Sequence, residues 1–199
     1  MRLERQMVVR KALDLLGEAG LEGLTTRRLA EALGVQGPAL YWHFKNKQEL
    51  MDEMALVLLQ DAYGPMAPGE DWAQWMVDGA RQLRRSLLSS RDGARLLAGF
   101  RPSSPHGRMD PKVALAPLVA AFGMPDALWA LLTVNRFTFG WTMDEQAALD
   151  RDPPFAGPLN TEEGFEFGLG AIVAGLATRL AAARAQDSPA ALAEEGRLT

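Results

Sequence analysis

The sequence contains no cysteine, so it can form no disulfide, thiolate metal site or cysteine nucleophile. It has only two histidines, and it lacks the GxSxG, HExxH, P-loop and dinucleotide-binding patterns around which many active sites are built. We therefore predict that the protein is not an enzyme and that it uses no cofactor and no bound metal. The absence of cysteine also fits a reducing compartment, and we predict a cytoplasmic location.

Long hydrophobic runs are scarce as well. The N-terminus, MRLERQMVVRKAL, carries a charge every few residues and has no apolar stretch of the kind found in signal peptides. The longest uninterrupted apolar run lies near residues 167–177, which is too short to span a bilayer. These two features predict a protein that has no membrane partner.

Charge is unevenly distributed along the chain. Residues 1–50 carry eight Lys and Arg against six Asp and Glu, whereas residues 51–199 carry 13 against 19, within a net charge of −4. A slightly basic N-terminal part suits contact with a polyanion, and an acidic remainder favours solubility. Taken alone, the bias is no larger than that of many solvated helical faces.

Helical periodicity dominates, and no run alternates as a strand does, so we predict an all-α fold. Gly20 is placed to end the first helix, and the Gly/Pro-rich stretch YGPMAPGED marks a domain boundary. We divide the chain into residues 1–46, a connecting helix at 47–63, a second domain at 64–186 and a flexible tail at 187–199. Within the second domain we expect helices at 70–89, 92–100, 108–122, 125–149 and 161–184.

The segment LTTRRLAEALGVQGPALYWHFKNKQEL has the order of features of a helix-turn-helix. Thr25 is placed to cap a helix, Gly34 to turn the chain after it, and Pro38 to begin a short helix that we expect to end near Phe44. Asn46, followed three residues later by a glutamate, is typical of a capping box that starts the next helix. Few other folds use these signals in this order.

The aromatic and cationic residues of YWHFKNK fit the second helix of such a motif, which enters the major groove of DNA. Leu40 and Phe44, four residues apart, are expected to face the core. The residues left to face the phosphates are Tyr41, His43 and Lys47. Taken singly, Tyr41 is a rim residue and Lys47 a solvated charge, but the order as a whole predicts DNA binding.

On these residues the sequence resembles the tetracycline-repressor (TetR) family of regulators. LTTRRLAEALGV and LYWHFKNKQEL are the most specific pieces, and LLSSRDGARLLAGFRP and FTFGWTMDEQ are similar to helices of the tetracycline-repressor subclass. The resemblance covers residues 3–149 and is loose in the last helix. It implies an N-terminal DNA-binding domain and a C-terminal ligand-binding and dimerisation bundle. It also implies a homodimeric repressor of a palindromic DNA operator, released when a small-molecule inducer moves the fourth helix.

The resemblance also suggests which residues contact DNA. Arg27 matches a guanine-reading arginine, and Gln36 is placed to address adenine. Gly37 and Ala39 stand where the subclass carries glutamine and threonine, so we predict an operator that differs from the tetracycline operator at those positions. The predicted DNA-contacting residues are Thr26, Arg27, Gln36, Gly37, Pro38, Ala39, Tyr41, His43 and Lys47.

The same resemblance implies a ligand pocket among the helices of the second domain. Arg101, Asn135 and Asp144 are the polar groups expected to orient a ligand in a mostly apolar pocket. Each leucine of the set, taken alone, is more typical of a core than of a pocket. The predicted pocket residues are Tyr63, Trp75, Leu83, Leu97, Phe100, Arg101, Pro102, Met109, Val113, Leu128, Leu131, Leu132, Asn135 and Asp144.

This pocket departs from that of the tetracycline-repressor subclass, which binds its drug as a magnesium chelate. A metal-binding histidine is matched here by Leu97 and a neighbouring threonine by Phe100, although Asp144 matches an acidic residue that binds the metal's water. The histidine, asparagine, phenylalanine and glutamine that contact the drug are matched by Tyr63, Gly79, Leu83 and Val113. We therefore predict a largely apolar or aromatic inducer that needs no metal, and not magnesium-tetracycline.

Some alternatives stay open at the level of sequence. The last helix has a side of small residues, which suits either a dimer interface or ordinary packing within one chain, and these residues are Gly168, Ala171, Gly175 and Ala182. We favour the dimer because helix-turn-helix proteins usually pair on palindromic sites. The main alternative function is a ligand-independent DNA-binding activator or architectural protein, and an enzyme that modifies a small molecule is the other.

Overall fold

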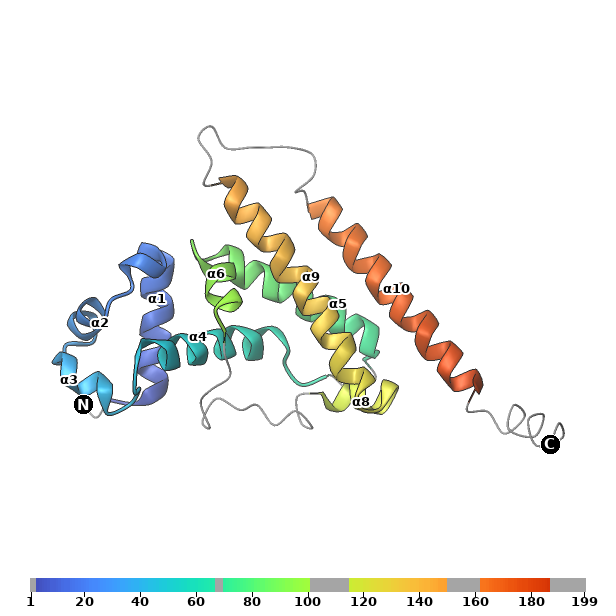
Figure 1. Ribbon diagram of the computed structural model, residues 1–199, viewed down its shortest axis with the longest axis horizontal. Coiled ribbons are helices and arrows are strands. Elements are labelled where there is room, and N and C mark those ends of the chain that lie inside the picture. Colours follow the sequence, from blue (N-terminus) through green and yellow to red (C-terminus); the bar gives the residue numbers. More distant parts are fainter. Residues whose placement is uncertain (1–2, 67–69, 101–114, 150–161, 187–199) are drawn as a thin grey trace.

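The computed structural model describes residues 3–66, 70–100, 115–149 and 162–186, and every regular element in these ranges is a helix (Figure 1). The helices are α1 (Arg5–Gly23), α2 (Thr26–Leu33), α3 (Gly37–Tyr41), α4 (Lys47–Ala62), α5 (Trp72–Leu88), α6 (Gly93–Ala98), α8 (Ala116–Phe122), α9 (Asp126–Leu149) and α10 (Glu162–Gln186). The all-α prediction is confirmed. Two expected segments lie outside the described residues: the tail at 187–199, and residues 108–114 of the helix expected at 108–122.

Local capping fixes the ends of the helices in the head, which we define as residues 3–46. The Thr25 hydroxyl accepts a hydrogen bond from the Arg28 N–H at 3.1 Å, and the Asn46 side chain accepts one from the Glu49 N–H at 2.8 Å. Each cap satisfies an N–H that has no partner within its helix, which stabilises the helix by about 1 kcal/mol. Gly34 ends α2 in the left-handed conformation, with φ 67°. The caps predicted from the sequence are thus confirmed.

The first helix is interrupted at Gly20, as expected: this residue is non-helical, with φ 67° and ψ −176°, and one further helical turn beyond the kink runs to Gly23. The short α3 ends at Tyr41 rather than near Phe44. Beyond it the His43 and Phe44 N–H groups both bond to the Leu40 carbonyl, and the chain leaves the helix as a turn. Phe44 is buried as expected, although it lies beyond the helix.

Two clusters of buried apolar side chains form the core. The first is continuous between the head and helices α4, α5 and α6, and it includes Val8, Leu16, Leu29, Phe44, Met54, Leu83, Leu87 and Leu97. The second lies among α5, α8, α9 and α10, and it includes Trp75, Met76, Leu118, Val134, Phe165 and Leu169. Because α4 and α5 pack directly on each other and α5 packs on α9, the head is joined to the bundle by continuous side-chain contact.

Two ion pairs tie α5 to the last two helices. Arg84 contacts both carboxylate oxygens of Glu145 on α9, at 2.7 and 2.9 Å, and its guanidinium lies 5.0 Å from the centre of the Phe165 ring. Arg81 contacts both carboxylate oxygens of Glu166 on α10, at 2.7 and 2.8 Å. Paired donors of this kind fix orientation as well as distance. They hold α10 alongside α9 at the edge of the molecule (Figure 1).

The outer face of α10 is apolar and exposed. Only 22% of the apolar window within Glu162–Arg184 is buried, and Phe167 on this face is 80% exposed. By length and composition alone this helix is sufficient to cross a membrane. The expectation that the run near residues 167–177 is too short to span a bilayer therefore does not extend to the helix as a whole.

Candidate nucleic-acid interface and ligand site

Three of the predicted DNA-contacting residues converge on one side of the head. Thr26 at the start of α2, Tyr41 at the end of α3 and Lys47 at the start of α4 line a single small cleft. Tyr41 is 59% exposed, and the Lys47 side chain is exposed apart from a long 3.5 Å contact between its ammonium and the Leu21 carbonyl. The cleft itself is lined mainly by apolar side chains, and these three residues stand at its rim on adjoining helices, where they are placed to meet neighbouring phosphates.

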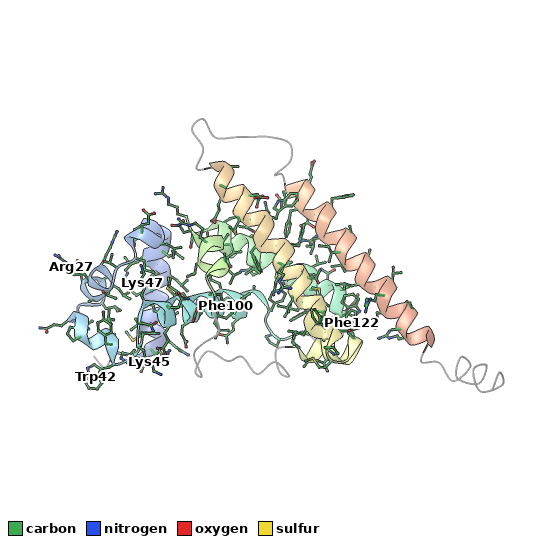
Figure 2. The ribbon with its side chains drawn as sticks, viewed as in Figure 1. Arg27, Trp42, Lys45, Lys47, Phe100 and Phe122 are labelled. Atoms are coloured by element: carbon green, nitrogen blue, oxygen red, sulfur yellow. The ribbon has the colours of Figure 1, made fainter. Side chains whose placement is uncertain are left out.

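Arg27 points away from the body of the protein at the far end of the head (Figure 2). Its side chain is 88% exposed and donates a hydrogen bond from Nε to Glu31, one turn further along α2, at 2.9 Å. This bond raises the Arg27 pKa, as does the charge of Glu31. The two terminal nitrogens of the guanidinium have no partner among the described residues. They are the pair of donors that a guanine edge accepts.

The remaining predicted DNA-contacting residues lie on or beside α3. Gln36 is exposed just before the helix and makes no side-chain cap, so its amide is available to a base edge. Pro38 is exposed, and Gly37, Ala39 and His43 are half-buried. A Cβ added at Gly37 would meet no atom within 4 Å, so the surface there is open. The helix therefore presents few polar side chains to a groove.

Sequence reasoning missed Trp42, which is 89% exposed and projects from the end of the head beside Lys45 (Figure 2). Together with the adjacent Tyr41, which is 59% exposed, it forms an exposed aromatic surface at the end of α3, and contiguous exposed apolar surface can mark an interaction site. The sequence does place Trp42 between Tyr41 and His43 in the YWHF run. Which of these side chains face outward depends on whether the helix continues past Tyr41, and the sequence alone does not determine that.

A polar pair is the central feature of the candidate ligand site. The Tyr63 hydroxyl donates to the Asn135 side-chain oxygen at 2.7 Å, and burial raises the Tyr63 pKa well above its usual range. The Tyr63 ring lies directly against Gly79, where an added Cβ would fall 2.1 Å from a ring carbon. The Trp75 ring lies 5.1 Å away, centre to centre. Tyr63, which directly follows α4, therefore forms one aromatic and polar cluster with Trp75 of α5 and Asn135 of α9.

The other predicted pocket residues are dispersed. Leu131 belongs to the second core cluster near Trp75, but Leu83 and Leu97 belong to the first cluster, with Phe100 half-buried against it. Leu132 is half-buried and Leu128 is 37% exposed. Arg101, Pro102, Met109 and Val113 lie outside the described residues.

Asp144 and Asn135 do not meet within this chain. They are separated on α9 by about two and a half turns, which places them on opposite sides of the helix. Asn135 is buried and Asp144 is exposed. Among the described residues no three His, Asp or Glu side chains gather as metal ligands do.

A second polar junction, not foreseen from the sequence, links the bundle to the head. The buried Asp92, just before α6, accepts a hydrogen bond from the Leu21 N–H of α1 at 2.7 Å and pairs with Arg95 at 2.7 Å. Burial alone raises the Asp92 pKa, but these two partners outweigh it, so the pKa lies below its ordinary value. The kink at Gly20 presents the Leu21 N–H to this carboxylate.

A capped three-helix head that projects exposed aromatic and cationic side chains, carried on a larger helical bundle, defines a helix-turn-helix DNA-binding protein. Comparison with known proteins makes the assignment specific. The family model "Bacterial regulatory proteins, tetR family" matches residues 8–54, and "Tetracyclin repressor-like, C-terminal domain" matches residues 64–156. The chain belongs to the tetR family of bacterial transcriptional regulators, whose members are DNA-binding proteins and not enzymes.

Individual relatives agree with this assignment. The chain is 40% identical to the tetracycline repressor protein class A from transposon 1721 of Escherichia coli, over 94% of this chain and 97% of the relative. It is similar to the crystal structure of TetR-Q116A from Acinetobacter baumannii AYE in complex with minocycline, with TM-score 0.70 and 36% identity over 89% and 98% of the two chains. It is also similar to BioQ with its double-stranded DNA operator, with TM-score 0.65 and 32% identity over 89% and 99%. The predicted resemblance to the tetracycline-repressor subclass is confirmed.

Proposed function

We propose that the protein is a ligand-responsive transcriptional repressor that binds a palindromic operator as a homodimer in the cytoplasm. The observation that carries the DNA-binding part is the convergence of Thr26, Tyr41 and Lys47 on one cleft, with Arg27 and Trp42 exposed at the far end of the head. The BioQ relative, solved with its operator, supports the same use of the head.

The exposed face of α10 supports the dimer. Ala171, Gly175 and Ala182 are exposed on this helix, and an added Cβ at Gly175 would meet no atom within 4 Å. Gly168 is different, because it lies against the Phe137 ring of the same chain and so belongs to internal packing. A second copy of the helix would cover Phe167 and the small residues together, which accounts for the apolar surface without a membrane.

Dimerisation through α10 sets the distance between the two heads. Two heads that enter successive major grooves must stand about 34–36 Å apart. A ligand that favours a different separation weakens operator binding, provided that it binds the two geometries with different affinity.

Tyr63 is placed to couple a ligand to the head. It follows the last residue of α4, and its N–H closes that helix onto the Leu59 carbonyl, while its hydroxyl bonds to Asn135 in the bundle. A molecule that enters beside Trp75 and displaces the Tyr63 ring therefore moves the C-terminal end of α4. The other end of α4 carries Lys47, a predicted phosphate contact.

The same cluster argues for the class of inducer. One solved relative is bound to minocycline, and another curated relative is a tetracycline repressor. Here the Tyr63 ring occupies the space over Gly79, and the apolar Leu97 and Phe100 stand where the tetracycline-repressor subclass carries polar residues. Drug oxygens left without partners in an apolar pocket cost about 1–3 kcal/mol each. We propose a planar aromatic inducer, bound without magnesium against Trp75 and oriented by the Tyr63–Asn135 pair.

Selection of binding sites from random duplexes, followed by fluorescence anisotropy, tests this function. We expect a palindromic site bound by two chains, which light scattering of the complex measures. Tetracycline with magnesium is expected not to release the protein from its operator. Planar aromatic compounds are screened for such release and for quenching of tryptophan fluorescence, and we expect the quenching to be lost in Trp75→Phe. Sequence-specific binding that no compound releases would favour the ligand-independent alternative. Magnesium-dependent release by tetracycline at low concentration would refute the proposed inducer class.

A further inference from the structure

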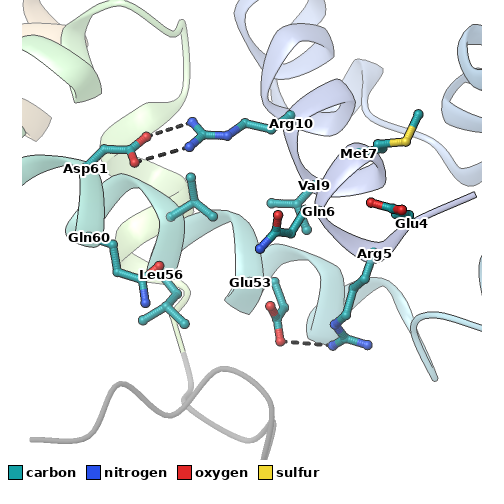
Figure 3. Close-up of a pocket in the computed structure, with 11 residues that line it drawn as sticks. Glu4, Arg5, Gln6, Met7, Val9, Arg10, Glu53, Leu56, Gln60 and Asp61 are labelled. Carbon is teal, nitrogen blue, oxygen red and sulfur yellow. Dashed lines mark hydrogen bonds and ion pairs between the residues drawn. The ribbon is translucent and has the colours of Figure 1, made fainter.

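Arg5, at the start of α1, contacts several residues outside its own helix. Its guanidinium contacts Glu49 at 2.8 Å and Glu53 at 2.9 Å, both on α4, and it donates to the His43 carbonyl. Its guanidinium carbon also lies over the Phe44 ring, 4.3 Å from the ring centre. The side chain is only 25% exposed, and Figure 3 shows its ion pair with Glu53 at one end of the groove between α1 and α4.

The residues that Arg5 holds are the ones that follow the recognition helix. The loop from Trp42 to Asn46 joins α3 to α4 and contains no helical hydrogen bonds beyond the turn at Leu40. Glu49 uses its second carboxylate oxygen to accept the Lys45 N–H at 2.8 Å. Arg5 and Glu49 therefore fix the backbone of this loop at two points, the His43 carbonyl and the Lys45 N–H.

In this cluster the ion pairs and hydrogen bonds offset the cost of burying the Arg5 and Glu49 charges. Burial lowers the Arg5 pKa, but the two carboxylates outweigh that effect and raise it above its ordinary value. Burial raises the Glu49 pKa, and its bonds to Arg5 and the Lys45 N–H outweigh this and lower it. Both groups therefore stay charged at neutral pH, and the cluster consists of charge-assisted hydrogen bonds.

We infer that Arg5 is a positioning residue for DNA recognition, in that it sets the orientation of the α3–α4 loop and so the specificity of the head. This inference rests on the proposed function, because it assigns a role in reading DNA. Arg5 acts through the loop and does not itself contact the duplex. Trp42 lies in the loop and Tyr41 and Lys47 flank it, so a change in the loop backbone alters their spacing relative to the bases read by α3.

The planar guanidinium is specific to this task. It offers five donors in fixed directions and stacks on a ring, whereas an ammonium offers a flexible point charge. Lysine at position 5 would keep the charge and one carboxylate contact, but it could not reach the His43 carbonyl, both carboxylates and the Phe44 ring together.

A matched comparison within α1 tests the inference. Arg10 also forms an ion pair with α4, contacting both oxygens of Asp61 at 2.7 and 3.2 Å, but its side chain is 61% exposed and touches nothing in the α3–α4 loop. Arg5→Gln and Arg10→Gln remove the same charge from the same helix. The full-length variants are compared by anisotropy with the selected operator and with a random duplex, and by thermal unfolding.

We expect Arg5→Gln to weaken operator binding about tenfold, which is the size of one displaced specific base contact, and to change random-duplex binding about as little as Arg10→Gln does. Arg5→Lys is expected to restore thermal stability more fully than operator preference. If both glutamine variants lose operator and random binding equally, or if Arg5→Lys restores operator preference completely, the positioning role is wrong and only charge or fold stability is at work. Failure of the wild-type chain to prefer any duplex would instead refute the proposed function.

Discussion

Substitution of Gly20 by alanine should destabilise the protein more than its backbone conformation alone explains. Gly20 has φ 67° and ψ −176°, a region almost restricted to glycine, so an alanine there costs about 1–3 kcal/mol in backbone strain. The new Cβ would also fall 2.4 Å from a carboxylate oxygen of Asp92 and push it away from the Leu21 N–H. Loss of that buried hydrogen bond adds about 1–3 kcal/mol. The expected total is about 2–6 kcal/mol.

Gly34→Ala provides the matched control. Gly34 has the same φ of 67°, but an added Cβ there meets nothing within 4 Å, so only the left-handed strain of about 1–2 kcal/mol applies. Urea denaturation of both variants, followed by circular dichroism, measures the two free energies of unfolding. Equal losses for the two variants would refute the reasoning, because they would show that the contact between Asp92 and Leu21 contributes nothing to the free energy of unfolding.

Three further outcomes are expected. Lys47→Ala should weaken binding to the operator and to random duplexes by similar factors, and it should reduce the slope of log affinity against log salt by about one, as loss of one phosphate contact does; an unchanged slope would remove Lys47 from the interface. Trp42→Ala should weaken DNA binding without changing thermal stability, because the side chain is 89% exposed, and a fall in melting temperature would show instead that it packs in the fold. The Asp92 and Glu166 carboxyls have lowered pKa values in the folded chain, so the stability that they contribute is present above their unfolded pKa of about 4 and is lost as the pH falls below it. The free energy of unfolding, measured as a function of pH, should therefore fall less on acidification in Asp92→Asn than in the wild-type chain.

The features predicted well from sequence are those that a few neighbouring residues determine. Thr25 caps α2 and Asn46 caps α4 through bonds to residues three positions away, and Gly34 turns the chain by itself. The helix-turn-helix is built from such local signals, so its helices and most of its exposed residues could be identified. The end of α3 could not, because the chain that follows it makes long-range contacts, such as the one between Arg5 and the His43 carbonyl 38 residues away, which no local pattern encodes.

The ligand site was less predictable because distant residues define it. The match of Tyr63 and Gly79 to drug-contacting positions was visible in the sequence, but their complementarity was not. Only the fold shows that a ring at one position fills the space left by the missing side chain at the other. The Tyr63–Asn135 bond joins residues separated by 72 positions, and no local pattern encodes such a pair.

The long-range polar contacts share a pattern that bears on regulation. Gln146 of α9 donates to the carbonyls of Leu87 and Ser90 and accepts the Ala94 N–H, so it holds the turn between α5 and α6 from one side. Asp92, in that same turn, accepts the Leu21 N–H of the head from the other side. The head is therefore attached to the bundle through α4, near Tyr63, and through this polar contact at the α5–α6 turn, in addition to the apolar core that they share. We propose that displacement of α4 by a ligand at Tyr63 changes the orientation of the head, because the contact at Asp92 holds one side of the head while α4 moves the other.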